Sequence, residues 1–140
     1  MTAEQPPQTI LLVEDDRDVR AALSAVLLDE GFEVLAAPNG YDALASIEQH
    51  QLDVIILDWM MPVIDGSEFV RALRSEYHIT TPVLVITAGR VSRDEAIAAG
   101  ADDYLQKPFD INELLSRVQS LSTGERGEAE APPNNRSAER

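Results

Sequence analysis

Short apolar runs alternate along the chain with segments in which apolar residues recur every three or four positions. The runs are typical of strands buried on both faces of a parallel sheet, and the spaced segments are typical of helices that cover it. Strands are predicted over 9–13, 32–36, 54–58, 83–87 and 104–106. The five intervening and following helices are predicted to begin at acidic or capping residues, namely Glu14–Asp16, Asn39, Asp65, Ser92 and Asp110.

This alternation predicts an α/β fold with a five-stranded parallel sheet flanked by five helices. A doubly wound, flavodoxin-like sheet has the strand order 2-1-3-4-5 and binds its ligand between strands 1 and 3. The second helix is expected to run to about His50. The helix after Ser92 has Ile97 as its one large apolar anchor and ends at Gly100, so we expect it to be among the less stable elements.

Both ends of the chain differ from the part between them. Residues 1–8 are polar with two prolines, and residues 122–140 lack large apolar side chains. Neither end can bury enough apolar surface to offset the entropy of ordering. We therefore expect a disordered lead over 1–8, one domain over 9–121 and a disordered tail or linker over 122–140.

Composition narrows the class of function. The net charge of −14 argues against direct nucleic-acid binding by these residues, because phosphate contacts need a basic surface. Without cysteine, the chain has neither disulfides nor a thiolate metal site. No apolar run approaches the ~18 residues of a membrane span, and the polar start does not resemble a signal peptide. A cytoplasmic protein that does not enter the membrane is expected.

Reactive side chains stand at the carboxyl ends of four predicted strands. Glu14 and Asp15 follow the first strand and Asp58 ends the third, while Thr87 and Lys107 stand at the ends of the fourth and fifth. In the predicted order these ends meet at one edge of the sheet. Asp58 alone could equally cap the following turn, but five such residues at strand ends favour a functional site.

Three neighbouring carboxylates need a counter-charge, which Mg²⁺ can supply. An aspartate can act as a nucleophile and form an acyl phosphate, while a lysine neutralises charge on the phosphoryl group. A threonine hydroxyl on the next strand can bond a phosphoryl oxygen. Lys107 is the only lysine of the chain, and a lysine and an arginine are not equivalent at such a position.

The segments LLVEDD, LDWMMPVIDG, VITA and YLQKPF resemble the receiver domains of bacterial two-component response regulators, over roughly residues 9–121. The chain also resembles chemotaxis-type response regulators. The resemblance fits either a stand-alone receiver domain or a receiver domain truncated before an output domain. It implies that Asp58 is the phosphoacceptor. It also implies that Asp15 and the Met60 backbone carbonyl join Asp58 as Mg²⁺ ligands, with Glu14 acting through a bound water.

The resemblance assigns switch roles as well. Thr87 matches the switch hydroxyl, Tyr104 the switch aromatic and Lys107 the phosphate-contacting lysine, with a cis peptide bond before Pro108. Two further features of this sequence are compared with the family pattern: one spacing and two residues that flank the site. The Thr87–Lys107 separation is shorter than in many members, and neither Met60 nor Gly89 can hold a water that would hydrolyse the acyl phosphate. We expect a phosphorylated state no shorter-lived than is usual for the family.

The predicted function is therefore that of a receiver domain. A histidine kinase, a phosphotransfer protein or a small phosphodonor supplies a phosphoryl group in a Mg²⁺-dependent reaction, with Mn²⁺ as a substitute. The chain is not expected to be an enzyme beyond its own phosphorylation and dephosphorylation. The face built from the last two helices and the last strand then signals to a downstream protein, an output domain or a second copy; its charged residues are Arg93, Asp102, Asp103, Glu113 and Arg117.

Three alternatives remain at the level of sequence. A phosphorylation-independent interaction module on the same fold would more often lack one of the five key residues. A small phosphohydrolase with an aspartyl nucleophile commonly carries a second acid two positions on, where this chain has Met60. A DNA-binding regulator would carry its output domain beyond Arg140. The kinase, the pathway and the output cannot be identified from these residues.

Overall fold

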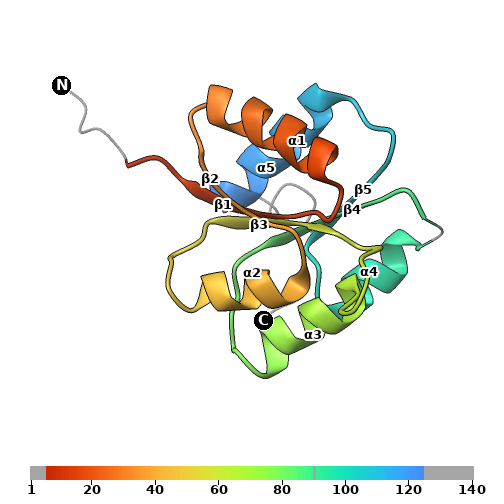
Figure 1. Ribbon diagram of the computed structural model, residues 1–140. Helices are drawn as coiled ribbons and strands as arrows, with labels where there is room; N and C mark the ends of the chain where they lie inside the picture. The colour runs from red at the N-terminus through yellow and green to blue at the C-terminus, as the bar shows by residue number, and fades with distance from the viewer. Residues whose placement is uncertain (1–5, 90, 125–140) are drawn as a thin grey trace.

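The structure is a computed structural model that describes residues 6–89 and 91–124. Strands and helices alternate along the chain from β1 to α5 (Figure 1). The strands are β1 (Thr9–Val13), β2 (Glu33–Ala37), β3 (Val54–Asp58), β4 (Val83–Thr87) and β5 (Asp103–Gln106). The helices are α1 (Arg17–Asp29), α2 (Gly40–Ile47), α3 (Gly66–Ser75), α4 (Arg93–Ala99) and α5 (Ile111–Ser122).

All neighbouring strands pair in parallel, and their order is β2-β1-β3-β4-β5. The predicted fold class and strand order are confirmed. Boundaries shift slightly: β2 begins at Glu33 and β5 at Asp103, each one residue from the prediction, and α2 ends at Ile47 rather than near His50.

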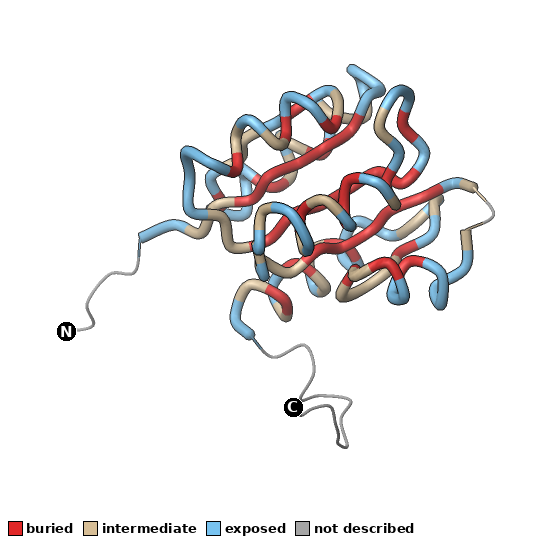
Figure 2. The backbone as a smooth tube through the Cα atoms, turned by 90° about the horizontal axis from the view of Figure 1, so that it is seen from below, coloured by how far each residue is buried: buried red, intermediate tan, exposed pale blue. Residues whose placement is uncertain are grey.

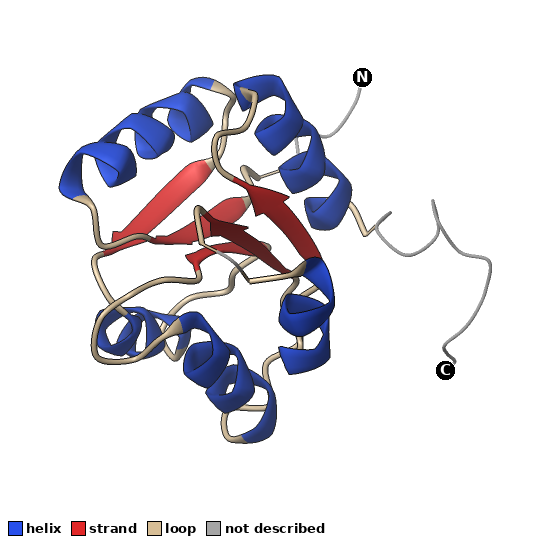
Figure 3. Cartoon of the chain, turned by 90° about the vertical axis from the view of Figure 1, so that its right-hand side faces the viewer, coloured by secondary structure: helices blue, strands red, loops and turns tan. Residues whose placement is uncertain are grey.

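Helices cover both faces of the sheet. α1 and α5 lie on one face, and α2, α3 and α4 lie on the other (Figures 1 and 3). Alternate residues of β1 enter the two cores: Ile10 and Leu12 pack with apolar residues of α1 and α5, while Leu11 and Val13 pack with those of α2, α3 and α4. β3 and β4 are buried along their whole length, as Figure 2 shows for the centre of the sheet, which explains their uninterrupted apolar sequences.

The predicted capping residues begin their helices. The Asp16 side chain accepts hydrogen bonds from the amides of Asp18 and Val19, so this third acid is the N-cap of α1. Asp65 with Glu68, and Ser92 with Glu95, form complete capping boxes at the starts of α3 and α4. These bonds satisfy backbone amides that have no partner within the helix.

The predicted packing of α4 is wrong in one respect. Ile97, expected as its inward anchor, is 40% exposed, whereas Ala96 and Ala99 are buried against the sheet. Ala96 and Ala99 are three positions apart and share one face of this seven-residue helix, and Ile97 lies beside that face. Small side chains therefore make the contact between α4 and the core.

The segment after Asp58 is fixed by a close contact between Trp59 and Gly66. Trp59 is buried, and its carbonyl accepts a hydrogen bond from the Gly66 amide. A Cβ atom at position 66 would lie 2.7 Å from Cε3 of the indole ring. Position 66 consequently requires glycine, and the β3–α3 segment closes tightly over the end of β3.

The expected lead and tail lie mainly outside the described residues, which exclude 1–5 and 125–140, and they stay predictions. Within the described part, Gln8 Nε2 donates a 2.9 Å hydrogen bond to the Ser122 carbonyl, so the entry to β1 contacts the end of α5. Among residues 6–89 and 91–124, no helix is both long and apolar enough to cross a membrane.

Candidate functional site

At the carboxyl edge of the sheet, backbone hydrogen bonds continue past the strands and link the end of β1 to β2, the end of β3 to β4 and the end of β5 to β4. The Glu14 amide bonds the Ala37 carbonyl, the Trp59 amide bonds the Ile86 carbonyl, and the Lys107 amide bonds the Thr87 carbonyl. These bonds are 2.8–3.1 Å long. The sheet itself therefore positions the residues that follow its strands, before any side-chain contact is made.

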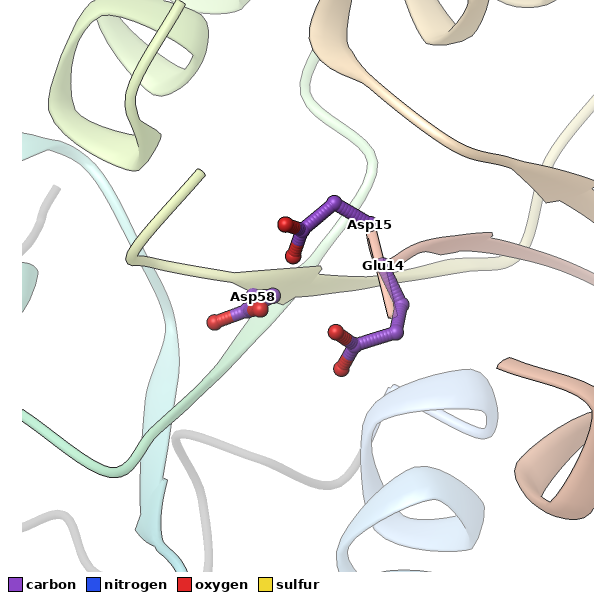
Figure 4. A group of neighbouring side chains, drawn as sticks. All are labelled: Glu14, Asp15 and Asp58. Carbon is purple, nitrogen blue, oxygen red and sulfur yellow. The ribbon is translucent and has the colours of Figure 1, made fainter. Parts of the chain in front are cut away.

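Three carboxylates gather at this edge. Glu14, Asp15 and Asp58 each offer an oxygen atom, and the three atoms lie within 4.8 Å of one another. Figure 4 shows the side chains, two from the segment after β1 and one from the end of β3. Glu14 and Asp58 are buried, whereas Asp15 is exposed. Oxygen ligands at this spacing, partly open to solvent, are the donor set that Mg²⁺ prefers.

Burial and repulsion raise the pKa of Asp58 to about 7. Desolvation is the largest cause, followed by hydrogen bonding with Glu14 and by the charge of Glu14. The charge of Lys107 and the hydrogen bond from the Met60 amide act in the opposite direction. Full ionisation of the three neighbouring acids is therefore costly. A divalent metal ion held by these carboxylates would offset their negative charge.

Lys107 brings a positive charge to the Glu14 side chain. Its Nζ lies 3.3 Å from Oε1 of Glu14, and Oε2 of Glu14 accepts a 3.1 Å hydrogen bond from the Asp16 amide. The Glu14 side chain is only 1% exposed, and both of its carboxylate oxygens have a polar partner, as a buried acid requires. The peptide bond between Lys107 and Pro108 is cis, as the family resemblance implied.

The two proposed switch residues lie on neighbouring strands. Thr87 is fully buried, and its Oγ1 accepts a 2.9 Å hydrogen bond from the Gly89 amide. Tyr104 pairs with Val85 in the β4–β5 register, and its hydroxyl donates a 2.6 Å hydrogen bond to the Val91 carbonyl. Each residue is thus tied to the segment between β4 and α4.

Met60 and Gly89 meet above the site. The Met60 amide donates a 3.1 Å hydrogen bond to Oδ1 of Asp58, and the Met60 side chain is more than half exposed. A Cβ atom at position 89 would lie 3.2 Å from both Cγ and Sδ of Met60. The thioether therefore extends over Gly89. The role of the Met60 carbonyl as a metal ligand stays a prediction.

Asp102, predicted to belong to the signalling face, accepts hydrogen bonds at its Oδ2 from Arg74 and from the Val83 amide, each 2.9 Å long. The other charged residues of that face pair with one another: Asp103 contacts Arg93 and Arg117, and Arg117 also contacts Glu113.

Sequence reasoning missed Arg20. Nη1 of Arg20 donates hydrogen bonds to the carbonyls of Glu14 and Asp15, at 2.8 and 3.4 Å. The available signal was an arginine one turn into the helix that follows an acidic pair. Its partners are backbone atoms, which no side-chain pattern reveals.

Comparison with known proteins identifies the family. Residues 10–119 match the family described as "Response regulator receiver domain". The chain is 42% identical over 124 residues to the transcriptional regulatory protein PcoR of Escherichia coli, a match that covers 87% of this chain and 54% of PcoR. The chain therefore spans about half the length of the curated relatives it matches.

Solved structures agree. The receiver domain of the Francisella response regulator 1452 has a TM-score of 0.79 and 34% identity, covering 84% of this chain and 98% of its own. TrrA of Thermotoga maritima, solved in complex with Mg²⁺ and beryllofluoride, has a TM-score of 0.74 and 32% identity, covering 81% and 98%.

The chain belongs to the response regulator receiver domain family. The general function of this family is to accept a phosphoryl group on an aspartate and to signal to an output domain. Its members act with histidine kinases and output domains, bind Mg²⁺ at their acidic site and are generally not enzymes.

Proposed function

We propose that Asp58 is the phosphoacceptor of this receiver domain. The observation that carries the proposal is the position of its carboxylate. It is buried at the end of β3, lies within reach of Glu14 and Asp15, and has a pKa that burial and the neighbouring Glu14 raise. A group that is costly to leave ionised without a cation is suited to react when a cation is bound.

Each neighbouring residue has a defined part in the transfer. One Asp58 oxygen forms a bond to phosphorus as the bond from phosphorus to the donor breaks, and the departing imidazole or acetate keeps that electron pair. The Met60 amide holds Oδ1 of Asp58, and Lys107 offers its ammonium group to the phosphoryl oxygens. Bound Mg²⁺ would neutralise charge on those oxygens, held by Asp15, Asp58 and the Met60 carbonyl, with Glu14 acting through a water. We expect Mn²⁺ to substitute.

We further propose that phosphorylation is read out through Thr87 and Tyr104. A hydrogen bond from Thr87 to a phosphoryl oxygen would draw the hydroxyl away from the Gly89 amide, which it now contacts. A hydrogen bond to a charged group contributes roughly 1.5–3 kcal/mol, whereas a nearly complete two-state switch needs ~5.5 kcal/mol. Thr87 alone is insufficient. Lys107 must leave Glu14, and the segment bonded to Tyr104 must rearrange with α4 to supply the rest.

The signalling surface is proposed to be α4, β5 and α5. Ile97 of α4 and Ile111 of α5 are both about two-fifths exposed, and the same three elements carry the paired charges of Arg93, Asp103 and Arg117. Exposed apolar side chains on elements that also carry charges of both signs suit a protein partner, an output domain or a second copy. The acidic net charge supports the proposal that these residues do not bind nucleic acid directly. We also propose that the protein is cytoplasmic and that a histidine kinase or a phosphotransfer protein phosphorylates it. The receiver domain is proposed to span residues 9–121.

The phosphorylated state is proposed to be no shorter-lived than is usual for the family. Met60 and Gly89 flank the site, and neither offers a side-chain group that could hold a hydrolytic water. Rapid loss of phosphate from the isolated chain would contradict this part.

Phosphorylation by acetyl phosphate in Mg²⁺ tests the phosphoacceptor directly. Intact-mass spectrometry should show the gain of one phosphoryl group by the wild type and none by D58N. The matched control is D65N, which changes the N-cap of α3 to another good capping residue and should react like the wild type. Equal phosphorylation of D58N would refute the proposal.

A further inference from the structure

Arg20 lies in the first turns of α1 and reaches back to the segment that carries two of the three acids. Its Nη1 is 2.8 Å from the Glu14 carbonyl and 3.4 Å from the Asp15 carbonyl, and the side chain belongs to a partly buried residue. Its own amide bonds the Asp16 carbonyl at 2.9 Å as part of the helix. The guanidinium therefore connects α1 to consecutive peptide groups of the β1–α1 connection.

Those peptide groups set the directions of the acidic side chains. The connection is three residues long, from β1 to the start of α1. At one end the Glu14 amide is fixed by Ala37, and at the other Asp16 caps the helix. The peptide groups between Glu14 and Asp16 lie at the centre of the connection, and Arg20 is bonded to their carbonyl oxygens. A small rotation of either group would move the Asp15 carboxylate away from Asp58.

Charge and position have opposite consequences for a bound cation. A positive side chain beside three carboxylates weakens cation binding by electrostatic repulsion. A side chain that holds two of those carboxylates in place strengthens cation binding, because the ligands need not be reorganised when the ion arrives. Replacement of Arg20 therefore raises the Mg²⁺ affinity if repulsion dominates and lowers it if positioning dominates.

We propose that Arg20 is a positioning residue for the metal site: it holds the Glu14 and Asp15 peptide groups so that both carboxylates face Asp58. This inference rests on the proposed function, in which the acidic cluster binds Mg²⁺. It concerns a residue that touches neither the metal nor the phosphoryl group and acts through the backbone of the two acids.

The experiment is a Mg²⁺ titration of metal-free protein by calorimetry, with Trp59 fluorescence as a second readout. R20M should weaken Mg²⁺ binding by about tenfold, the lower end of the range for residues that orient metal ligands. R17M is the matched control, because it removes the same charge from an exposed residue at the start of the same helix. R17M should bind Mg²⁺ as tightly as the wild type or slightly more tightly.

Comparison of R20K with R20M shows whether the hydrogen bond or the repelling charge of residue 20 dominates Mg²⁺ affinity. R20K restores the repelling charge together with an N–H donor, so it should bind Mg²⁺ more tightly than R20M. Thermal unfolding in the presence of a chelator accompanies each titration, because a role in folding alone would lower the melting temperature and leave the affinity of the folded protein unchanged.

The outcomes distinguish the two proposals. Mg²⁺ binding by the wild type with equal or tighter binding by R20M, or R20K no tighter than R20M, would overturn the role of Arg20 alone. Failure of the wild type to bind Mg²⁺ would instead overturn the proposed function on which the inference rests.

Discussion

Nζ of Lys107 lies 3.3 Å from Oε1 of Glu14, although 93 residues separate the two in the sequence. β5 and β1 are not neighbours in the sheet, so this ion pair spans the edge at which β3 presents Asp58. The Glu14 side chain is 1% exposed and that of Lys107 is 24% exposed. The lysine thus compensates a buried acid in this structure. Under the proposed function, it would change partners to contact a phosphoryl group on Asp58.

The first prediction concerns K107M. The charge of Lys107 lowers the pKa of Asp58, so its removal should raise that pKa above about 7. Carboxyl carbon NMR of Asp58 in metal-free protein would follow the titration. R71M, which removes a positive charge from an exposed position of α3, is the control and should leave the midpoint in place. A midpoint that is unchanged or lowered in K107M would contradict the electrostatic account.

The second prediction concerns the pH dependence of stability without metal. Because the pKa of Asp58 is raised from 3.8 to about 7, the folded state binds the proton more tightly than the unfolded state. Its contribution to stability is fully present below the unfolded value and is lost as pH rises towards 7. D58N has no titrating group at position 58 and does not lose this stability. The difference in free energy of unfolding between D58N and the wild type should therefore grow in favour of D58N between pH 4 and 7, by at most ~1.4 kcal/mol per pH unit.

Denaturant unfolding of both proteins in a chelator across that pH range measures the difference. The difference in free energy of unfolding should be constant above about pH 7. Saturating Mg²⁺ should reduce this difference, because the cation stabilises the ionised carboxylate of the wild type. Parallel stability curves for the two proteins would show that Asp58 is not perturbed as described.

The third prediction concerns the contact between Tyr104 and the segment after β4. Y104F removes the hydroxyl that donates to the Val91 carbonyl, a bond worth roughly 0.5–1.5 kcal/mol. Hydrogen exchange of amides between β4 and α4 should accelerate in the unphosphorylated protein, while Mg²⁺ affinity stays unchanged. Y41F, at an exposed tyrosine, should alter neither quantity. Unchanged exchange in Y104F would remove this tyrosine from the proposed switch.

The fourth prediction concerns Gly66. A methyl group at this position would lie 2.7–2.8 Å from atoms of Trp59, including its Cα, so the clash cannot be relieved by a side-chain rotation. G66A should lower the free energy of unfolding by about 1–3 kcal/mol and change the Trp59 emission. G89A meets the flexible Met60 side chain instead and should cost less. Denaturant unfolding of the two variants provides the comparison; equal losses would contradict the contact.

The strand ends were predictable because uninterrupted apolar runs identify buried strands, and the residue after such a run lies at the ligand-binding edge. Glu14, Asp58 and Lys107 are therefore both predicted and found together. Ile97 was misplaced because a helix of seven residues is too short for its apolar spacing to define the buried face. The ion pair between Asp102 and Arg74 of α3 was not predicted, because a sequence does not reveal contacts between such distant segments.

The central claim is that a phosphoryl group is transferred to Asp58 itself. After treatment with acetyl phosphate and Mg²⁺, borohydride reduces an aspartyl phosphate to homoserine, and tandem mass spectrometry of the peptides locates the modified residue. The account predicts homoserine at position 58 of the wild type, and none when Mg²⁺ is replaced by a chelator. Homoserine at position 15 or elsewhere, with Asp58 unmodified, would contradict it.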